Sequence, residues 1–462
     1  MLLLTNRDSD NVGDQLIEAT VISLVKAAFA NLNVRKSDVS ITSLEAGVIS
    51  KAYLRTKDPA LLEGARRAIS SADVVVFGGA PLFNYAYQNF YLRTITTIQL
   101  AQEYGVPVLF SSIGVEPFDA ENPKCIALKE ALASPVVRQI TTRDDYASLQ
   151  KYTEGTNIPI ALVSDPAVFA DVVFSGHKGR LAPHPPAPTL TSRARRLART
   201  AVDTVQGRQR ANPIRGAKPG PSTKTIGLVV TRPGLFKDNG IRFTAANQQT
   251  FWLDTIKLIE DRGYDYKLFT TGHFTDEVFL DAMVRSEGIP VNKAAITVNT
   301  PEELVAELRA CEGVIAYRLH ASIASFAYGI PSIGLSWNFK VPYFYSTVGL
   351  GERAIAPEQW IATEAVDALE RAMVEGVPKD EAFLVSVYET LFSGLKGIFA
   401  PSSQQSAYTY PELRRRMPRY KGTSHTQYRA KVNRKLRRAY ESYQKYSLYY
   451  LAAEAEKRAS RQ

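Results

Sequence analysis

Cysteine and long apolar runs are scarce in this sequence, and each scarcity disfavours a class of protein. Only two of the 462 residues are cysteines, Cys125 and Cys311, and no Cys-x-x-Cys or Cys/His cluster occurs. A disulfide framework or a zinc site is therefore disfavoured, and a reducing compartment fits best. No apolar run approaches the ~20 residues of a membrane helix, and the apolar start ends at Arg7, too early for a signal sequence. We expect a cytoplasmic protein, attached at most to the inner face of the plasma membrane.

Charge is divided unevenly along the chain, whose formal net charge is +10. Residues 175–224 contain eleven Lys or Arg and one acidic residue, and residues 414–462 contain fifteen Lys or Arg and three acidic residues. The remainder is therefore acidic, so an acidic globular body carries two basic segments.

Short β-like runs alternate with helical periodicities, which is typical of βαβ units and parallel sheets. We expect strands at 2–5, 73–77, 106–111, 136–142 and 160–163, and again at 225–230, 265–271, 313–317 and 332–335. Seven prolines interrupt this pattern between residues 175 and 224. The sequence therefore predicts an α/β protein with two Rossmann-like domains that face a cleft, in a GT-B-like arrangement.

Four segments follow from this pattern. We assign residues 1–174 to an N-terminal Rossmann-like domain on the acceptor side and residues 225–400 to a C-terminal Rossmann-like domain that binds the donor. Residues 175–224 form a basic, Pro-rich linker or insertion with one short helix near 192–205. Residues 401–462 form a basic, Tyr-rich helical tail.

Glycines and polar residues follow the strands of the first half, where ligands bind in open parallel sheets. Gly13 permits a tight turn at a helix start, where backbone N–H groups can face an anion, although the same motif is an ordinary helix cap. A glycine pair lets the backbone approach a ligand closely or makes a plain turn. Arg143 is either a cleft residue or, with Asp144, part of a local ion pair. The candidates in this half are Asn11, Gly13, Asp14, Gly78, Gly79 and Arg143.

Cations follow four strands of the second half. Arg232, His273, the pair Arg318 and His320, and Lys340 stand at successive strand ends, with His320 placed just before a helix at 322–328. Cations that converge there form a site for a polyanion such as phosphoenolpyruvate. The alternatives are a structural role for either histidine and a solvated surface position for Lys340.

These residues together resemble the polysaccharide pyruvyl transferase family over most of residues 1–356. The matching pieces are Asn11-x-Gly13-Asp14, Gly78-Gly79, Ile113-Gly114-Val115, Arg143-Asp144, Asp165-Pro166-Ala167, Arg318-Leu319-His320 and Gly329-Ile330-Pro331. The resemblance implies a GT-B-like fold, phosphoenolpyruvate as donor and a cyclic ketal product in exopolysaccharide or cell-surface glycan biosynthesis. One departure is Ala80-Pro81, because the family often has a third glycine after the pair.

The resemblance also implies that Arg318, His320 and Arg232 hold the donor. We expect His320 to act as general acid and base, the two arginines to clamp the phosphate or carboxylate, and Lys340 to add charge. Asp14 is a candidate base near the acceptor. No metal or other cofactor is required.

The family's acceptors imply a lipid-linked oligosaccharide as partner, and for the basic tail we favour an anionic membrane surface. A solvated helical tail is the alternative, and we do not expect nucleic acid because the acidic body would repel it. Two other functions stay open. One is a GT-B glycosyltransferase in which Glu302 or Glu303 grips the ribose of a nucleotide sugar. The other is a non-catalytic scaffold of polysaccharide assembly at the membrane.

Overall fold

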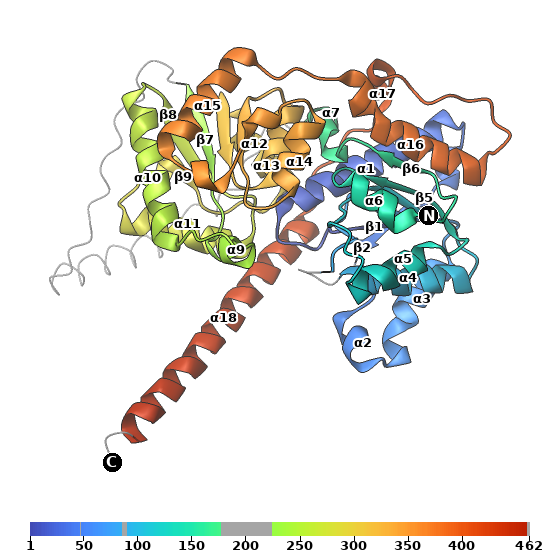
Figure 1. Cartoon of the computed structure of the whole chain (residues 1–462), viewed down its shortest axis with the longest axis horizontal. Helices are drawn as coiled ribbons and strands as arrows, with labels where there is room; N and C mark the ends of the chain where they lie inside the picture. The colour runs from blue at the N-terminus through green and yellow to red at the C-terminus, as the bar shows by residue number, and fades with distance from the viewer. Residues whose placement is uncertain (47, 86–89, 177–223, 460–462) are drawn as a thin grey trace.

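The computed structural model describes residues 1–46, 48–85, 90–176 and 224–459, and these form two α/β units side by side (Figure 1). Almost all of the predicted linker, with the helix expected near 192–205, lies outside the described residues. Each unit contains one parallel six-stranded sheet with helices packed against it. The predicted fold class is therefore confirmed.

The N-terminal sheet has the strand order β2-β1-β3-β4-β5-β6. Its strands are β1 (Leu2–Thr5), β2 (Thr42–Glu45), β3 (Val75–Gly78), β4 (Val108–Ile113), β5 (Val137–Thr142) and β6 (Ile160–Leu162). The strands β1, β3 and β4 are buried along their whole length, as expected for central strands covered on both faces. The sequence does not predict β2 because this edge strand is partly exposed and has no apolar run.

The C-terminal sheet has the order β12-β11-β10-β7-β8-β9. Its strands are β7 (Thr225–Val229), β8 (Asp265–Phe269), β9 (Ala294–Ala295), β10 (Gly313–Ala316), β11 (Ser332–Leu335) and β12 (Ala354–Ile355). All nine predicted strands are confirmed, with ends that move by a few residues. The two edge strands β9 and β12 contain two residues each and are too short to give a sequence pattern.

The helices before the linker are α1 (Val12–Asn31), α2 (Lys51–Thr56), α3 (Glu63–Ser70), α4 (Phe90–Glu103), α5 (Pro123–Leu132), α6 (Tyr146–Thr153) and α7 (Ala170–Val173). Those that follow it are α9 (Gly234–Asp238), α10 (Ala245–Asp261), α11 (Phe274–Ser286), α12 (Pro301–Arg309), α13 (Leu319–Ala327), α14 (Lys340–Thr347) and α15 (Ala362–Glu375). The chain ends with α16 (Glu381–Phe399), α17 (Tyr410–Arg416) and α18 (His425–Ala459). Cys125 in α5 and Cys311 after α12 are both buried and free.

The predicted C-terminal domain 225–400 is wrong for its last helix, because α16 returns to the N-terminal unit. It packs against α1, β4 and β5, and Gly394 lies so close to the sheet that a Cβ there would stand 2.6 Å from Oε1 of Gln139. The reason is its apolar face, which includes Leu384, Leu391 and Leu395 and is buried there. Among the described helices, α16 alone is long and apolar enough to cross a membrane, and 39% of its apolar window is buried in the protein.

The predicted tail is likewise only partly a tail. Tyr410, Leu413 and Met417 are buried against the N-terminal unit, so the α17 region belongs to the body. The helix α18 begins between the two units and then extends away from both (Figure 1). Only its distal part is free of the body.

Candidate active site

The carboxyl ends of the two sheets meet between the units. The backbone N–H of Val12, at the start of α1, donates a hydrogen bond to the carbonyl of Thr271 beyond β8, with an N···O distance of 2.7 Å. Gly272 has φ +82°, and a Cβ there would stand 2.6 Å from the Val12 side chain. The strand ends that carry the candidate residues are therefore in direct contact where the two units meet.

His320 lies at the centre of this contact. The prediction placed it before a helix, but α13 begins one residue earlier, so His320 is in the first helical turn. Its Nδ1 lies 2.9 Å from Nδ2 of Asn11, and its Nε2 lies 3.8 Å from Oδ1 of Asp14. Gly13 is required because a Cβ there would overlap the imidazole ring. The N-cap of α1 and the Arg-x-His pair thus form one cluster.

The N-cap fixes the tautomer of His320. Oδ1 of Asn11 accepts a hydrogen bond from the backbone N–H of Gly13 at 3.1 Å, which leaves Nδ2 as the atom that donates to His320. Nδ1 of the neutral imidazole must then be the acceptor, and Nε2 carries the proton. The proton on Nε2 faces Asp14.

Burial shifts the pKa of both groups. Desolvation, with the nearby cations Arg143, Arg318 and Lys340, lowers the pKa of His320 to about 3. Desolvation raises the pKa of Asp14, although Ser9, Asn6 and Arg143 oppose that shift. The cluster therefore favours an uncharged imidazole and makes the Asp14 carboxyl easier to protonate.

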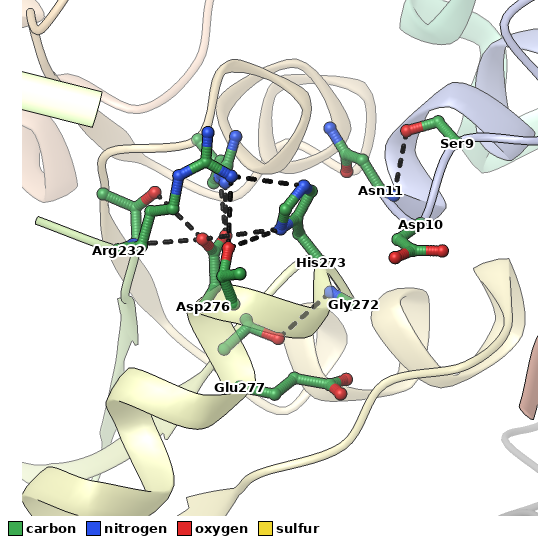
Figure 2. Close-up of polar contacts among 12 residues, drawn as sticks. Ser9, Asp10, Asn11, Arg232, Gly272, His273, Asp276 and Glu277 are labelled. Atoms are coloured by element: carbon green, nitrogen blue, oxygen red, sulfur yellow. Dashed lines mark hydrogen bonds and ion pairs between the residues drawn. The ribbon is translucent and has the colours of Figure 1, made fainter. Parts of the chain in front are cut away.

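Arg318 is held by a buried carboxylate that the sequence analysis missed. Its Nε donates to Oδ2 of Asp276 at 2.8 Å, and its second terminal nitrogen lies 2.5 Å from the same oxygen. Asp276 has no exposed surface. Its other oxygen accepts from the backbone N–H of Arg232 at 3.0 Å, so one carboxylate orients two cationic residues (Figure 2). Its position resembles an ordinary acidic residue in the first turn of α11, and only the fold reveals the partner.

Arg232 and His273 lie beside this carboxylate (Figure 2). A terminal nitrogen of Arg232 lies 3.3 Å from Nε2 of His273 and donates to Oγ1 of Thr275 at 3.1 Å. Burial, followed by Arg318 and Arg232, lowers the pKa of His273 well below its ordinary 6.5. A neutral His273 accepts from Arg232 and fixes its direction.

The N-terminal unit contributes a second buried arginine. Arg143 forms an ion pair with Asp165, and both side chains are almost fully buried. The neighbouring Asp144 accepts from the backbone N–H of Val115 at 2.8 Å. Desolvation lowers the pKa of Lys340, and the negative charge of Asp144 partly offsets that shift. Arg143 does form an ion pair, but with Asp165 and not with Asp144 as the sequence suggested, and its charge also acts on His320 and Asp14.

The two glycines of the predicted pair differ in position. A Cβ at Gly78 would stand 2.8 Å from the Val21 side chain, so this glycine allows α1 to pack on β3. Gly79 has φ +62°, and a Cβ there would stand 2.3 Å from the Ile17 side chain of α1 and 3.7 Å from a terminal nitrogen of Arg143. Both glycines therefore allow α1 to pack closely on the sheet, and Gly79 also lies near Arg143.

Several cations of the basic tail form hydrogen bonds and ion pairs with the body of the protein. Lys435 lies 2.5 Å from Oε1 of Glu277, Lys431 donates to the backbone carbonyls of Ser9 and Asp10, and Arg438 pairs with Asp10. Burial lowers the pKa of Lys431 to about 7. These side chains join the start of α18 to both walls of the cleft, which leaves fewer tail cations for a membrane than the sequence predicts.

The candidate residues gather positive charge where the two units meet. Within the described residues, no three His, Cys, Asp or Glu side chains gather closely enough to hold a metal ion. Arg143, Arg232, Arg318 and Lys340 supply the positive charge.

A family model described as polysaccharide pyruvyl transferase matches residues 11–220 and 248–338 of this chain. Among curated proteins, none is similar enough in sequence to match it. A solved structure described as a putative UDP-N-acetylglucosamine 2-epimerase from Listeria monocytogenes has 12% identity and a TM-score of 0.51, and the match covers 88% of this chain and 98% of that one. The UDP-GlcNAc 2-epimerase of Methanocaldococcus jannaschii has 13% identity and a TM-score of 0.48, with coverages of 86% and 98%. At these identities the likeness concerns the fold alone.

Proposed function

Because this chain belongs to the polysaccharide pyruvyl transferase family, we propose that it transfers the pyruvyl unit of phosphoenolpyruvate to two hydroxyls of a sugar. The product is a cyclic ketal, and the process is exopolysaccharide or cell-surface glycan biosynthesis. The observation that carries this proposal is the group of cations at the cleft, two of which share Asp276.

The donor fits this group by charge. Phosphoenolpyruvate carries a phosphate and a carboxylate, and arginine recognises such groups with paired N–H donors. Asp276 orients the guanidinium of Arg318, and His273 and Thr275 orient that of Arg232. Lys340 and Arg143 add positive charge near His320. In this arrangement the arginines clamp the donor and stabilise the departing phosphate.

The reaction requires one proton at carbon and the loss of two protons from hydroxyls. Protonation of the methylene carbon builds positive charge at C2, and the first sugar hydroxyl adds there and loses its proton. The bond between C2 and the phosphate oxygen then breaks, its electron pair leaves with the phosphate, and the second hydroxyl adds to C2 and loses its proton. One hydroxyl proton balances the proton given to the methylene carbon, and the other is taken up by the phosphate. The products are the ketal and inorganic phosphate, and no oxidant or reductant is needed.

The pKa shifts favour different roles for the two central groups from those that the sequence suggests. His320 was expected to be the general acid and base, but its neutral Nε2–H form suits a hydrogen-bond donor to the phosphate or carboxylate. Asp14, whose pKa is raised, suits the group that gives and takes protons. We therefore propose Asp14 as the acid and base, with His320 as a neutral donor fixed by Asn11.

The acceptor and the place of action are also proposals. We propose a lipid-linked oligosaccharide as acceptor and a cytoplasmic enzyme that works at the membrane surface. A nucleotide-sugar donor has less support, because the carboxylates considered for a ribose are occupied. Glu302 accepts from the backbone N–H and the hydroxyl of Thr423, and Glu303 accepts from the backbone N–H of Asn299.

Release of phosphate from phosphoenolpyruvate tests this function. Purified protein is incubated with the donor and a panel of hexose glycosides, beside an Arg318→Ala, His320→Ala double variant. A Lys51→Ala variant on the exposed surface of α2 is the matched control. We expect release that depends on the acceptor in the wild type and the control, and none in the double variant. Equal release without any acceptor, or binding of a nucleotide sugar in preference to phosphoenolpyruvate, would contradict the proposal.

A further inference from the structure

A large open groove lies along the outer face of α1, apart from the candidate active site. Its volume is about 1090 Å³. It shares no lining residue with the cluster around His320. One wall is α1 and the chain that leads into β2, and the other is the segment 418–434 that enters α18. A groove of this size is at the upper end of what small-molecule sites occupy.

Apolar side chains line part of the groove, between polar and charged ones. Lining residues of α1 recur at intervals of three and four, which is the spacing of one helical stripe. The apolar members of the groove include Ile22, Phe29, Val34, Val39 and Ile41. Most of these are only partly buried by the rest of the chain, so they offer apolar surface to a hydrocarbon chain.

Unpaired cations stand beside these apolar side chains. Seven of the lining side chains are cationic and two are acidic, and both acids are already paired, Asp8 with Arg434 and Glu18 with Arg7. Three further lysines, Lys26, Lys36 and Lys421, come from separate segments and form no ion pair with any described residue.

Two of these lysines lie close enough to Lys26 for their charges to act on it. Partial burial, then the charges of Lys421 and Lys36, lower the pKa of Lys26. Like charges gathered at one place without an acid are stabilised by an external anion. Apolar side chains next to such a group are complementary to a molecule that joins a phosphate to a hydrocarbon chain.

We propose that this groove binds an anionic membrane phospholipid, with the acyl chain along α1 and the phosphate at Lys26, Lys36 and Lys421. The inference depends on the groove and not on the reaction proposed for the cleft. It also places the membrane contact at α1 and the segment 418–434 rather than along the distal part of α18, because several tail cations pair within the protein.

Vesicle sedimentation tests the proposal. The full-length protein is mixed with vesicles of phosphatidylcholine alone or with phosphatidylglycerol added, and we expect binding only to the second. Lys26→Ala, Lys36→Ala, Lys421→Ala should weaken this binding roughly 100-fold, from ~1 kcal/mol for each cation near an anionic surface. The matched control replaces three exposed lysines elsewhere, Lys51, Lys57 and Lys151, and should bind as the wild type does. Equal loss in both triple variants would overturn the groove as the site.

Two further variants test whether vesicle binding depends on the groove itself, rather than on net charge or on α18. Ala430→Trp, which fills the groove without a change in charge, should also reduce binding, whereas removal of residues 439–462 should leave it intact. A soluble probe, dioctanoyl phosphatidylglycerol, should bind the wild type, while glycerol phosphate should not. If glycerol phosphate bound equally well, or if removal of 439–462 abolished vesicle binding, the lipid groove would be wrong. None of these results depends on turnover, so they leave the pyruvyl transfer proposal to its own test.

Discussion

Each unit of this protein places one buried arginine at the end of a strand, and the two arginines have different surroundings. Arg143 follows β5 and pairs with Asp165, whose other oxygen caps a short helical turn by accepting from the backbone N–H of Ala167 at 2.8 Å. Arg318 follows β10 and pairs with Asp276, whose other oxygen instead accepts from the backbone N–H of Arg232. The same device is therefore structural in one unit and organises a cationic group in the other.

The largest difference is expected between the two arginines themselves. Arg318→Ala should lower kcat/KM about 1000-fold, as the loss of a preorganised donor to a developing anion does. Arg143→Ala should lower it by about tenfold, because Arg143 is paired with Asp165 and acts on His320 only through its charge. Steady-state rates with phosphoenolpyruvate measure both, and equal losses would remove the distinction between the units.

The second largest difference in rate is expected between the aspartates that pair with these two arginines. Asp276→Asn should lower kcat/KM about 100-fold because the fork of Arg318 loses its orientation, and it should cost about 3–5 kcal/mol of stability as a broken buried pair. Asp165→Asn should cost similar stability with a much smaller effect on rate. Urea unfolding and kinetics on both variants give the comparison. A rate loss in Asp165→Asn as large as that in Asp276→Asn would contradict it.

Two glycines of the N-terminal unit test the same contrast between a position at the site and a position in the core. Gly13→Ala should push His320 from its place and lower kcat roughly tenfold, with about 1–3 kcal/mol of lost stability from overpacking. Gly78→Ala meets Val21 in the core, so it should lower stability by a similar amount with little effect on kcat at temperatures where the protein is folded. Thermal unfolding combined with kcat separates the two, and an unchanged kcat in Gly13→Ala would place His320 outside the reaction.

The smallest expected effect on kcat/KM is that of pH. Because the pKa of His320 is about 3, the imidazole stays neutral from pH 5.5 to 8, and kcat/KM should show no inflection near 6.5 from this residue. His320→Gln keeps a donor and should retain more activity than His320→Ala. The folded protein binds fewer protons here than the unfolded chain, so stability should fall as pH drops through 6.5 toward 3. A step near pH 6.5 that disappears in His320→Gln would restore the histidine as acid and base.

The strands and several cleft residues could be predicted because their signals are local. An apolar run followed by glycine or a cation marks a strand end, and the carboxyl ends of parallel strands meet at one edge of a sheet. This rule alone places Arg232 and His320 near one another, and it puts Asn11 at the matching edge of the other sheet. The pairing of Asn11 with His320 could not be predicted, since it depends on how the two units dock.

The remaining features depend on contacts between distant segments. Asp276 has the sequence signature of a helix start, and its burial against Arg318 appears only in the fold. The apolar face of α16 gives no sign of which sheet it covers. The cations of the tail look solvated in the sequence, although Lys431 and Lys435 are buried between the units.

The most direct measurement supplies phosphoenolpyruvate labelled with carbon-13 at C2 to the purified protein with a glycoside acceptor and follows the label by nuclear magnetic resonance. Our account predicts that the label moves to a carbon bonded to two oxygens of the sugar, at a rate that Arg318→Ala reduces about 1000-fold. Label that stays in phosphoenolpyruvate with every acceptor, including lipid-linked ones, or that appears only in free pyruvate, would contradict it.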